Sequence, residues 1–444
     1  MAQSPMIDQA MARSLDLLNR FAGSDLARRL GLLEPAQRLV REGSRRGFQA
    51  AEAAAKAFQP LVKLVKPVRA ERAGGDLSVF DLRPTEEQAM MQETVRRFAT
   101  TVMRAEARAA DDRGAPPEGF LERAAELGLL QLAIPEALGG YGGERDPVAD
   151  VLVLEELASG DMALALVVAA PLAVVRALVQ CGTASQQSRY LAAFAEDGAL
   201  PAAMAVVEPR PLFDPYRLAT RALRTEGGWT LNGVKSLVPL GGSARFWLVA
   251  AAAEGLGPRL FIVERGAPGL AVRPEPAMGL RGADLARIEL TDVVVAEDAM
   301  LGHGDDDGLS WAELVDGARI AWAAMAVGAS RAVLEHVVPY ANERQAFGEP
   351  ISHRQSVAFM IADIAIELDG MRLLTWRAAS RASAGVEHRR EAALARIQAV
   401  EKGMKIGTDG IQLLGGAGFI KEHPVELWYR HLRAVGVMDG GLLV

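Results

Sequence analysis

The spacing of hydrophobic residues changes twice along the chain. Over residues 83–200, apolar side chains recur at intervals typical of helices. The run 85–88 (Thr-Glu-Glu-Gln) supplies an N-cap residue and acidic side chains for a first helical turn. Over residues 202–298 the apolar runs become short and β-branched or alternating, and after residue 308 helical spacing returns until residue 435. Helices, then strands, then helices predict an α+β fold with an antiparallel middle domain.

Five strands are predicted in the middle segment, separated by Gly, Pro or Asn-Gly. They cover residues 229–240, 246–252, 259–264, 270–274 and 286–295. Asn232-Gly233 is a strong signal for a hairpin turn. The expected organisation is a helical extension over 1–75, an all-α domain over 83–200, a β domain over 201–300 and a helical bundle over 305–444.

The first 75 residues differ in charge from the rest of the chain. Up to Arg72 they contain 13 Lys and Arg against 7 Asp and Glu, a net charge of +6, whereas the whole chain carries -7. Apolar residues recur here near helical spacing. Two interpretations stay open: short helices packed on the main body, or a basic amphipathic surface for an anionic membrane or a partner.

Composition narrows the class of protein. At 444 residues the chain is expected to form two to three domains. The net charge of -7 argues against nucleic-acid binding, and the single cysteine, Cys181, excludes a disulfide framework. No metal site is expected, because the six histidines show no H-E-x-x-H spacing. The apolar run 162–175 is too short for a membrane span and predicts a buried helix. Residues 1–12 do not resemble a secretory signal. A reducing cytoplasm is the expected location.

Four motifs in a fixed order carry a resemblance to the acyl-CoA dehydrogenase family. They occupy residues 128–142, 278–295, 342–355 and 412–419. The resemblance spans about residues 83–440. It implies a helical N-terminal domain, a middle β domain and a C-terminal four-helix bundle, with FAD as cofactor and an acyl-CoA as substrate. It also implies a homodimer or homotetramer, or a hetero-oligomer with a related subunit, and an electron-transfer flavoprotein as electron acceptor.

The cofactor-binding residues implied by the resemblance lie in the last two motifs. Arg344 and Phe347 match an arginine and a phenylalanine that reach a neighbouring subunit's FAD, where a forked guanidinium suits the pyrophosphate. Gln355 belongs to the same motif. The adenylate cradle is matched by Gln412, Leu413, Leu414, Gly415 and Gly416. The alternative is a helix C-cap at Gly415-Gly416 with an exposed Arg344.

Asp316 and Arg319 resemble the family's D-x-x-R at the acyl-CoA site. Their spacing of three places both on one face of a helix. A surface ion pair is the alternative explanation of the same spacing.

Asp439 is the candidate catalytic base. The family's reaction removes an α-proton with a carboxylate and passes the β-hydrogen as hydride to flavin N5. That carboxylate is usually a glutamate before a glycine near the C-terminus, and here the matching stretch, 437–441, contains Asp439. Some members carry the base on an earlier helix, but the matching position is Ala318.

Four residues depart from the family's flavin-ring motifs: Val207, Phe213, Leu237 and Pro239. They replace hydroxyl or aromatic side chains that contact the cofactor, and the chain ends at Val444 before the family's last helix would begin. Two functions are therefore expected: an acyl-CoA dehydrogenase with Asp439 as base, or a half-site subunit that completes a partner's FAD site in a hetero-oligomer.

Overall fold

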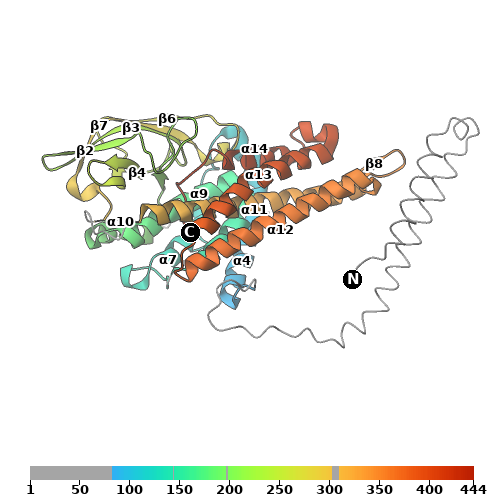
Figure 1. Cartoon of the computed structure of the whole chain (residues 1–444), viewed down its shortest axis with the longest axis horizontal. Helices are drawn as coiled ribbons and strands as arrows, with labels where there is room; N and C mark the ends of the chain where they lie inside the picture. The colour runs from blue at the N-terminus through green and yellow to red at the C-terminus, as the bar shows by residue number, and fades with distance from the viewer. Residues whose placement is uncertain (1–82, 144, 197–198, 303–309) are drawn as a thin grey trace, which may run out of the picture. The chain divides into compact units, whose positions relative to one another are not determined.

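The computed structural model describes residues 83–143, 145–196, 199–302 and 310–444. The predicted extension over 1–75 lies outside these ranges. Within them the order is helices, strands and helices, so the predicted α+β fold is confirmed (Figure 1).

The N-terminal part is all helical. Its elements are α4 (Glu86–Phe98), the π-helical η1 (Ala99–Met103), α5 (Arg104–Arg113), α6 (Phe120–Ala125), α7 (Leu129–Ala133), η2 (Glu136–Leu138), α8 (Pro147–Gly160), α9 (Met162–Cys181) and α10 (Ala184–Glu196). Thr85 caps α4, as predicted, and the structure shows in addition that it forms a capping box with Gln88. Helix α9 is long and apolar enough to cross a membrane, but almost all of it is buried within the fold. It is therefore the buried helix predicted for residues 162–175.

The middle part is one twisted sheet. Its strands are β1 (Ala202–Ala205), β2 (Arg221–Thr225), β3 (Gly228–Val238), β4 (Phe246–Ala253), β5 (Gly257–Glu264), β6 (Leu270–Pro274) and β7 (Ala286–Ala296). They follow the order β1-β4-β2-β3-β7-β6, and β5 pairs with β4. Most pairs are antiparallel, as predicted, but β1 and β2 both run parallel to β4. Two turns of 3-10 helix, η3 (Arg281–Ala283) and η4 (Glu297–Ala299), flank β7.

The hairpin predicted at Asn232-Gly233 is wrong. Strand β3 runs through both residues and carries a bulge against β7 there. Asn232 is used differently: its amide donates to the Asp292 carboxylate at 2.9 Å and its carbonyl accepts from the Asp292 backbone N–H at 2.9 Å. A Cβ on Gly233 would lie 2.7 Å from the Thr220 Cα, so this glycine is needed for a close approach.

The C-terminal part is the expected helical bundle. It consists of α11 (Trp311–Glu343), the hairpin β8 (Gln345–Ala346) and β9 (Glu349–Pro350), η6 (Ile351–His353), α12 (Gln355–Ser383), α13 (Arg389–Leu414), η7 (Gly415–Phe419) and α14 (Val425–Val435). Helices α11 and α13 run in the same direction. At one end Arg389 pairs with Asp316 at 3.4 Å, and at the other the Tyr340 hydroxyl donates to the Leu414 carbonyl at 3.2 Å. The β8–β9 hairpin lies at the second end (Figure 1).

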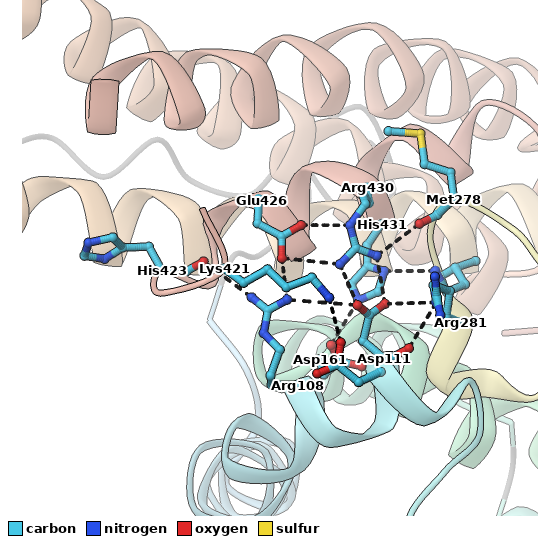
Figure 2. Close-up of polar contacts among 12 residues, drawn as sticks. Arg108, Asp111, Asp161, Met278, Arg281, Lys421, His423, Glu426, Arg430 and His431 are labelled. Carbon is cyan, nitrogen blue, oxygen red and sulfur yellow. Dashed lines mark hydrogen bonds and ion pairs between the residues drawn. The ribbon is translucent and has the colours of Figure 1, made fainter. Parts of the chain in front are cut away.

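A polar network joins the three parts (Figure 2). Arg430 of α14 binds both carboxylate oxygens of Asp111 of α5 at 2.7 Å and the Met278 carbonyl of the middle part at 3.0 Å. His431 accepts the Leu280 N–H at Nδ1 and lies 3.0 Å from the buried Asp161 through Nε2. Since Nδ1 is an acceptor, the proton of a neutral ring is on Nε2. The bundle is thereby held against both other parts.

Candidate active site

The segment that carries Asp439 is fixed against the core. The Trp322 Nε1–H donates to the Gly440 carbonyl at 2.9 Å, and Arg396 of α13 donates to the Met438 carbonyl. Gly440 has φ 72°, and a Cβ there would lie 2.6 Å from a Val206 methyl. Glycine is therefore required directly after Asp439 for the turn to pack on β1 and the loop that follows it.

Asp439 is largely buried, and one of its carboxylate oxygens, Oδ1, is buried without a hydrogen-bond partner. Burial is the largest influence on the pKa of Asp439 and raises it, and the nearby Asp214 carboxylate acts in the same direction. The guanidinium groups of Arg396 and Arg319 lower the pKa but do not outweigh burial, so the pKa of Asp439 is raised overall. A carboxyl with a raised pKa and a free oxygen has the properties of a general base.

Asp316 and Arg319 lie at the same end of the bundle as Asp439. Asp316 is buried, and its carboxylate lies 3.6 Å from Arg319 and 3.4 Å from Arg389 of α13. The Arg319 guanidinium is 6.0 Å from the ring of Tyr216 in the loop before β2. The alternative of a surface pair does not describe this arrangement, because the carboxylate is held inside the protein between two arginines.

The four residues that depart from the flavin-ring motifs lie between the sheet and the bundle or in the adjoining loop. Val207, Leu237 and Pro239 line an apolar cavity of about 10 Å³, with Leu166, Trp322 and Met438 on its other sides. A space of that size holds about one water. Phe213 is half-buried, and the guanidinium carbon of Arg210 lies 5.6 Å from the centre of its ring. Ala318 is buried and offers no carboxylate.

A buried lysine lies next to this cavity. Lys235 of β3 is fully buried and its Nζ is 3.0 Å from Glu208. Burial lowers the pKa of Lys235 to about 8, although Glu208 raises it. The Glu208 carboxylate also accepts the N–H groups of Ala219 and Thr220 at 2.7 and 2.8 Å. These bonds tie the loop that holds Phe213 and Tyr216 to the sheet.

The residues expected to bind the adenylate end of FAD gather at the opposite end of the bundle. Phe347 and Gly348 form the two-residue turn of the β8–β9 hairpin, both with positive φ. Phe347 is 94% exposed and strained for a non-glycine residue, which is a feature of functional sites. Arg344, which caps α11, is exposed, and so is Gln355 at the start of α12.

The motif 412–416 closes helix α13 at this same end. Leu413 and Leu414 are buried, whereas Gln412, Gly415 and Gly416 are exposed. Gly415 is the C-cap of α13, so the helix-cap alternative is part of the geometry. Nothing lies within 4 Å of a Cβ placed on either glycine, which leaves this surface open to a ligand.

The two groups of candidate residues are far apart in one chain. From Arg319 to Arg344, helix α11 rises by about 38 Å, and from Arg396 to Gln412, α13 rises by about 24 Å. The structure thus brings Asp439 together with Asp316 and Arg319, and Arg344 together with the 412–416 turn, but not the one group with the other.

Sequence reasoning missed Arg396 and Arg389, which face Asp439 and Asp316. They are seven residues apart on α13, and Arg396 follows the buried positions Ala392 and Ala395. An arginine beside such an alanine face is a signal that could have found them.

Comparisons with known proteins identify the family of the chain. Models of the N-terminal, middle and C-terminal domains of acyl-CoA dehydrogenases match residues 85–197, 203–293 and 307–441. The acyl-CoA dehydrogenase of Bacillus subtilis (strain 168) is 31% identical over 80% of this chain and 95% of its own length. Butyryl-CoA dehydrogenase from Megasphaera elsdenii shares 28% identity with a TM-score of 0.74 over 81% of this chain and 96% of that one. The FAD complex of PigA shares 26% identity with a TM-score of 0.74, again over 81% and 96%. The chain therefore belongs to the acyl-CoA dehydrogenase family and is an FAD-dependent enzyme of that family.

Proposed function

We propose that Asp439 removes the α-proton of an acyl-CoA thioester in this dehydrogenase. The observation that carries the proposal is the unpartnered, buried carboxylate oxygen of Asp439 at the end of the bundle where Asp316 and Arg319 lie. Asp316 and Arg319 are proposed to contact the substrate. An aspartate is one methylene shorter than the family's glutamate, so the α-carbon must approach the turn at residues 438–440 more closely.

The residues at the two ends of the bundle fit FAD unequally. Arg344, Phe347, Gln355 and the open surface of the 412–416 turn suit the pyrophosphate and adenylate, because they are exposed and offer a guanidinium, a ring and backbone groups. The cavity of about 10 Å³ beside Val207 and Leu237 is too small for a three-ring group in this conformation. Bound FAD supplies the acceptor for the substrate's β-hydrogen.

We propose that a complete site is shared between subunits. The proposed adenylate residues and Asp439 lie at opposite ends of the bundle, so a second chain is needed to bring them together. Helix α12 offers a surface for such an assembly, since Phe359, Ile366 and Leu373 recur every seven residues and remain exposed in one chain. A homodimer or homotetramer is expected.

A second candidate function is favoured by the narrow ring-side cavity. The chain would then act as a half-site subunit, whose Arg344 and Phe347 complete the FAD site of a related partner in a hetero-oligomer. The changed residues Val207, Leu237 and Pro239 all line this cavity, whereas the proposed adenylate residues are open to solvent.

Anaerobic bleaching of the flavin by acyl-CoA separates the two candidates. With Asp439 as base, Asp439→Asn should slow bleaching by about 10²- to 10⁴-fold, whereas Asp439→Glu should keep or raise the rate. Flavin content and melting temperature should change little in both variants. Wild-type protein that holds FAD but bleaches no faster than the Asn variant, at any chain length, would exclude Asp439 as base. Dependence of turnover on a partner's own carboxylate would support the half-site function.

An electron-transfer flavoprotein is the proposed electron acceptor, and the cytoplasm the proposed location. For the basic segment over residues 1–75, helices packed on the main body and a surface for anionic membranes remain the two interpretations, and the second is tested with vesicles. Deletion of the segment should abolish binding to anionic vesicles, and added salt should weaken binding of the intact chain. Absence of vesicle binding at low salt would leave the interpretation as packing helices.

A further inference from the structure

The ammonium of Lys235 on β3 is fully buried and takes no part in the proposed reaction. Its Nζ donates to the Val206 carbonyl at 3.2 Å and to the Glu208 carboxylate at 3.0 Å. Taking an ammonium out of water is costly, and an apolar side chain of similar volume often gives equal or greater stability at such a position. Stability alone therefore does not account for Lys235, and the places that its two bonds connect become the relevant feature.

The first bond leads to the segment that carries Asp439. Val206 follows β1 directly and is buried. A Cβ on Gly440 would lie 2.6 Å from a Val206 methyl, so the turn after Asp439 packs directly on Val206. On its other side the turn is held by Trp322, whose Nε1–H donates to the Gly440 carbonyl at 2.9 Å. A displacement of Val206 would therefore move Gly440 and the adjacent Asp439.

The second bond leads to the loop between β1 and β2. Glu208 stands at the start of this loop, and its carboxylate accepts the N–H groups of Ala219 and Thr220 at the end of the loop, at 2.7 and 2.8 Å. The loop also contains Asp214, whose charge raises the pKa of Asp439. The two bonds of the buried ammonium thus reach two of the segments that surround the carboxyl of Asp439.

The charge of this ammonium depends on pH in an accessible range. Burial lowers the pKa of Lys235 to about 8, Glu208 raises it and Arg210 lowers it. Burial raises the pKa of Glu208, but its bonds lower that pKa overall, so Glu208 stays ionised when Lys235 loses its proton. Arg210 Nε, at 3.7 Å, is a more distant partner of the carboxylate. Because a buried carboxylate without a close cation is strongly destabilised, both bonds should weaken above about pH 8.

We propose that the ammonium of Lys235 is a positioning group for Asp439. By binding the Val206 carbonyl and Glu208 together, it fixes the segment on which Gly440 packs and the loop between β1 and β2. Lys235 acts through these segments and does not touch the substrate. The role rests on the proposed function, in which Asp439 removes the α-proton.

The pH dependence of anaerobic flavin bleaching by acyl-CoA tests this role. In wild type the rate should fall about tenfold per pH unit above about pH 8, as a single group loses its proton. Lys235→Arg keeps its charge at every pH used, so its alkaline limb should move up by more than about one pH unit. Glu208→Gln removes the charge that raises the pKa of Lys235, so its alkaline limb should move down. Lys235→Met lacks the titrating group, and it should show no limb near pH 8 and be slower at every pH by up to about 10²-fold.

Hydrogen–deuterium exchange follows the same bonds without turnover. In wild type, exchange corrected for its chemical rate should rise between pH 7 and pH 9 in residues 206–220 and 438–441. In Lys235→Arg it should not rise. Lys402→Met is the matched control, because Lys402 pairs with Glu367 at 2.8 Å between α13 and α12 and its loss should change neither measurement. Glu208→Gln, which preserves the volume of the side chain, decides the test if Lys235→Arg does not fold.

An alkaline limb that stays in place in both Lys235→Arg and Glu208→Gln would overturn the role of Lys235, and so would wild-type exchange over 438–441 that does not depend on pH. These outcomes are separable from that of the proposed function. If Asp439→Asn slows bleaching as expected but the limb does not move, only the role of Lys235 fails. If exchange follows the charge of Lys235 while Asp439→Asn bleaches as fast as wild type, only the proposed base fails, and Lys235 still fixes the position of Asp439.

Discussion

Four ionisable side chains from three elements surround the carboxyl of Asp439. Arg396 belongs to α13, Arg319 to α11, and Asp214 and Tyr216 to the loop before β2. Arg396 also holds the Met438 carbonyl, and its Nη1 is buried without a hydrogen-bond partner. We infer that Arg396 is a positioning residue, which sets both the place and the charge of the proposed base.

Replacing Arg396 by methionine should move the pH dependence of flavin reduction. The base acts when ionised, and Arg396 lowers the pKa of Asp439, so its loss raises that pKa. The acidic limb of kcat should shift to higher pH, and the rate lost at neutral pH should return partly under alkaline conditions. Arg396→Lys should restore much of the original profile. Arg390→Met, at an exposed position on the same helix, serves as the control. If the acidic limb does not move in Arg396→Met, Arg396 is not the positioning residue of Asp439.

Helix α8 connects the N-terminal helices to the bundle through two adjacent carboxylates. Glu156 is fully buried. Its carboxylate lies 2.8 Å from Nη2 of Arg96 on α4 and accepts a hydrogen bond of 2.9 Å from Nη1 of Arg331 on α11. Its neighbour Glu155 accepts the Trp376 indole N–H of α12 at 2.8 Å. One turn of one helix thereby holds three others.

Glu156→Gln should destabilise the fold in a pH-dependent way. Burial raises the pKa of Glu156, but Arg331 and Arg96 outweigh it and hold the pKa at about 2. Because the folded-state pKa is depressed, this stabilisation is present above the ordinary glutamate pKa and is lost as pH falls toward 2. It amounts to about 3 kcal/mol. Urea unfolding at pH 7 and pH 4 should show a wild-type advantage that shrinks at the lower pH. The control is Glu106→Gln, in a half-exposed ion pair, which should lower the free energy of unfolding by less than about 1 kcal/mol. A difference between wild type and Glu156→Gln that does not depend on pH would contradict the role proposed for Glu156.

At the scale of the whole molecule, the bundle separates Asp439 from Arg344 by most of its length. In the proposed assembly, a site that uses both residues draws them from two chains. Arg344 is exposed, so its loss should leave the fold intact and lower flavin retention instead.

Co-expression of Asp439→Asn and Arg344→Ala chains should restore activity that each lacks alone. In a mixed dimer one site receives an intact Asp439 and an intact Arg344, so random pairing should regain about a quarter of wild-type turnover. The double variant combined with either single variant should regain none. Failure of the two single variants to complement, with mixed oligomers isolated by two affinity tags, would place both residues in one site of one chain.

The sequence by itself determined the local structure and the family. Period and capping residues predicted the helical regions and the strands β3 to β7, because these features act between residues close in the chain, whereas the short strands β1 and β2 were not predicted. The bounds of β6 and the buried helix at residues 162–175 followed from that pattern. The hairpin at Asn232-Gly233 was predicted wrongly, since a turn signal cannot report that Asp292 and Thr220 lie close to it in space.

Only the tertiary structure decided which residues that are far apart in the sequence lie in the same environment. The motifs named Asp439, Asp316 and Arg344, but not that the first two lie at one end of the bundle and the third at the other. Arg396 appears in the sequence only as an arginine beside an alanine face, and its contact with the Asp439 segment arises only when α13 packs against the C-terminal residues. The cavity of about 10 Å³ likewise arises only when side chains from separate segments pack together.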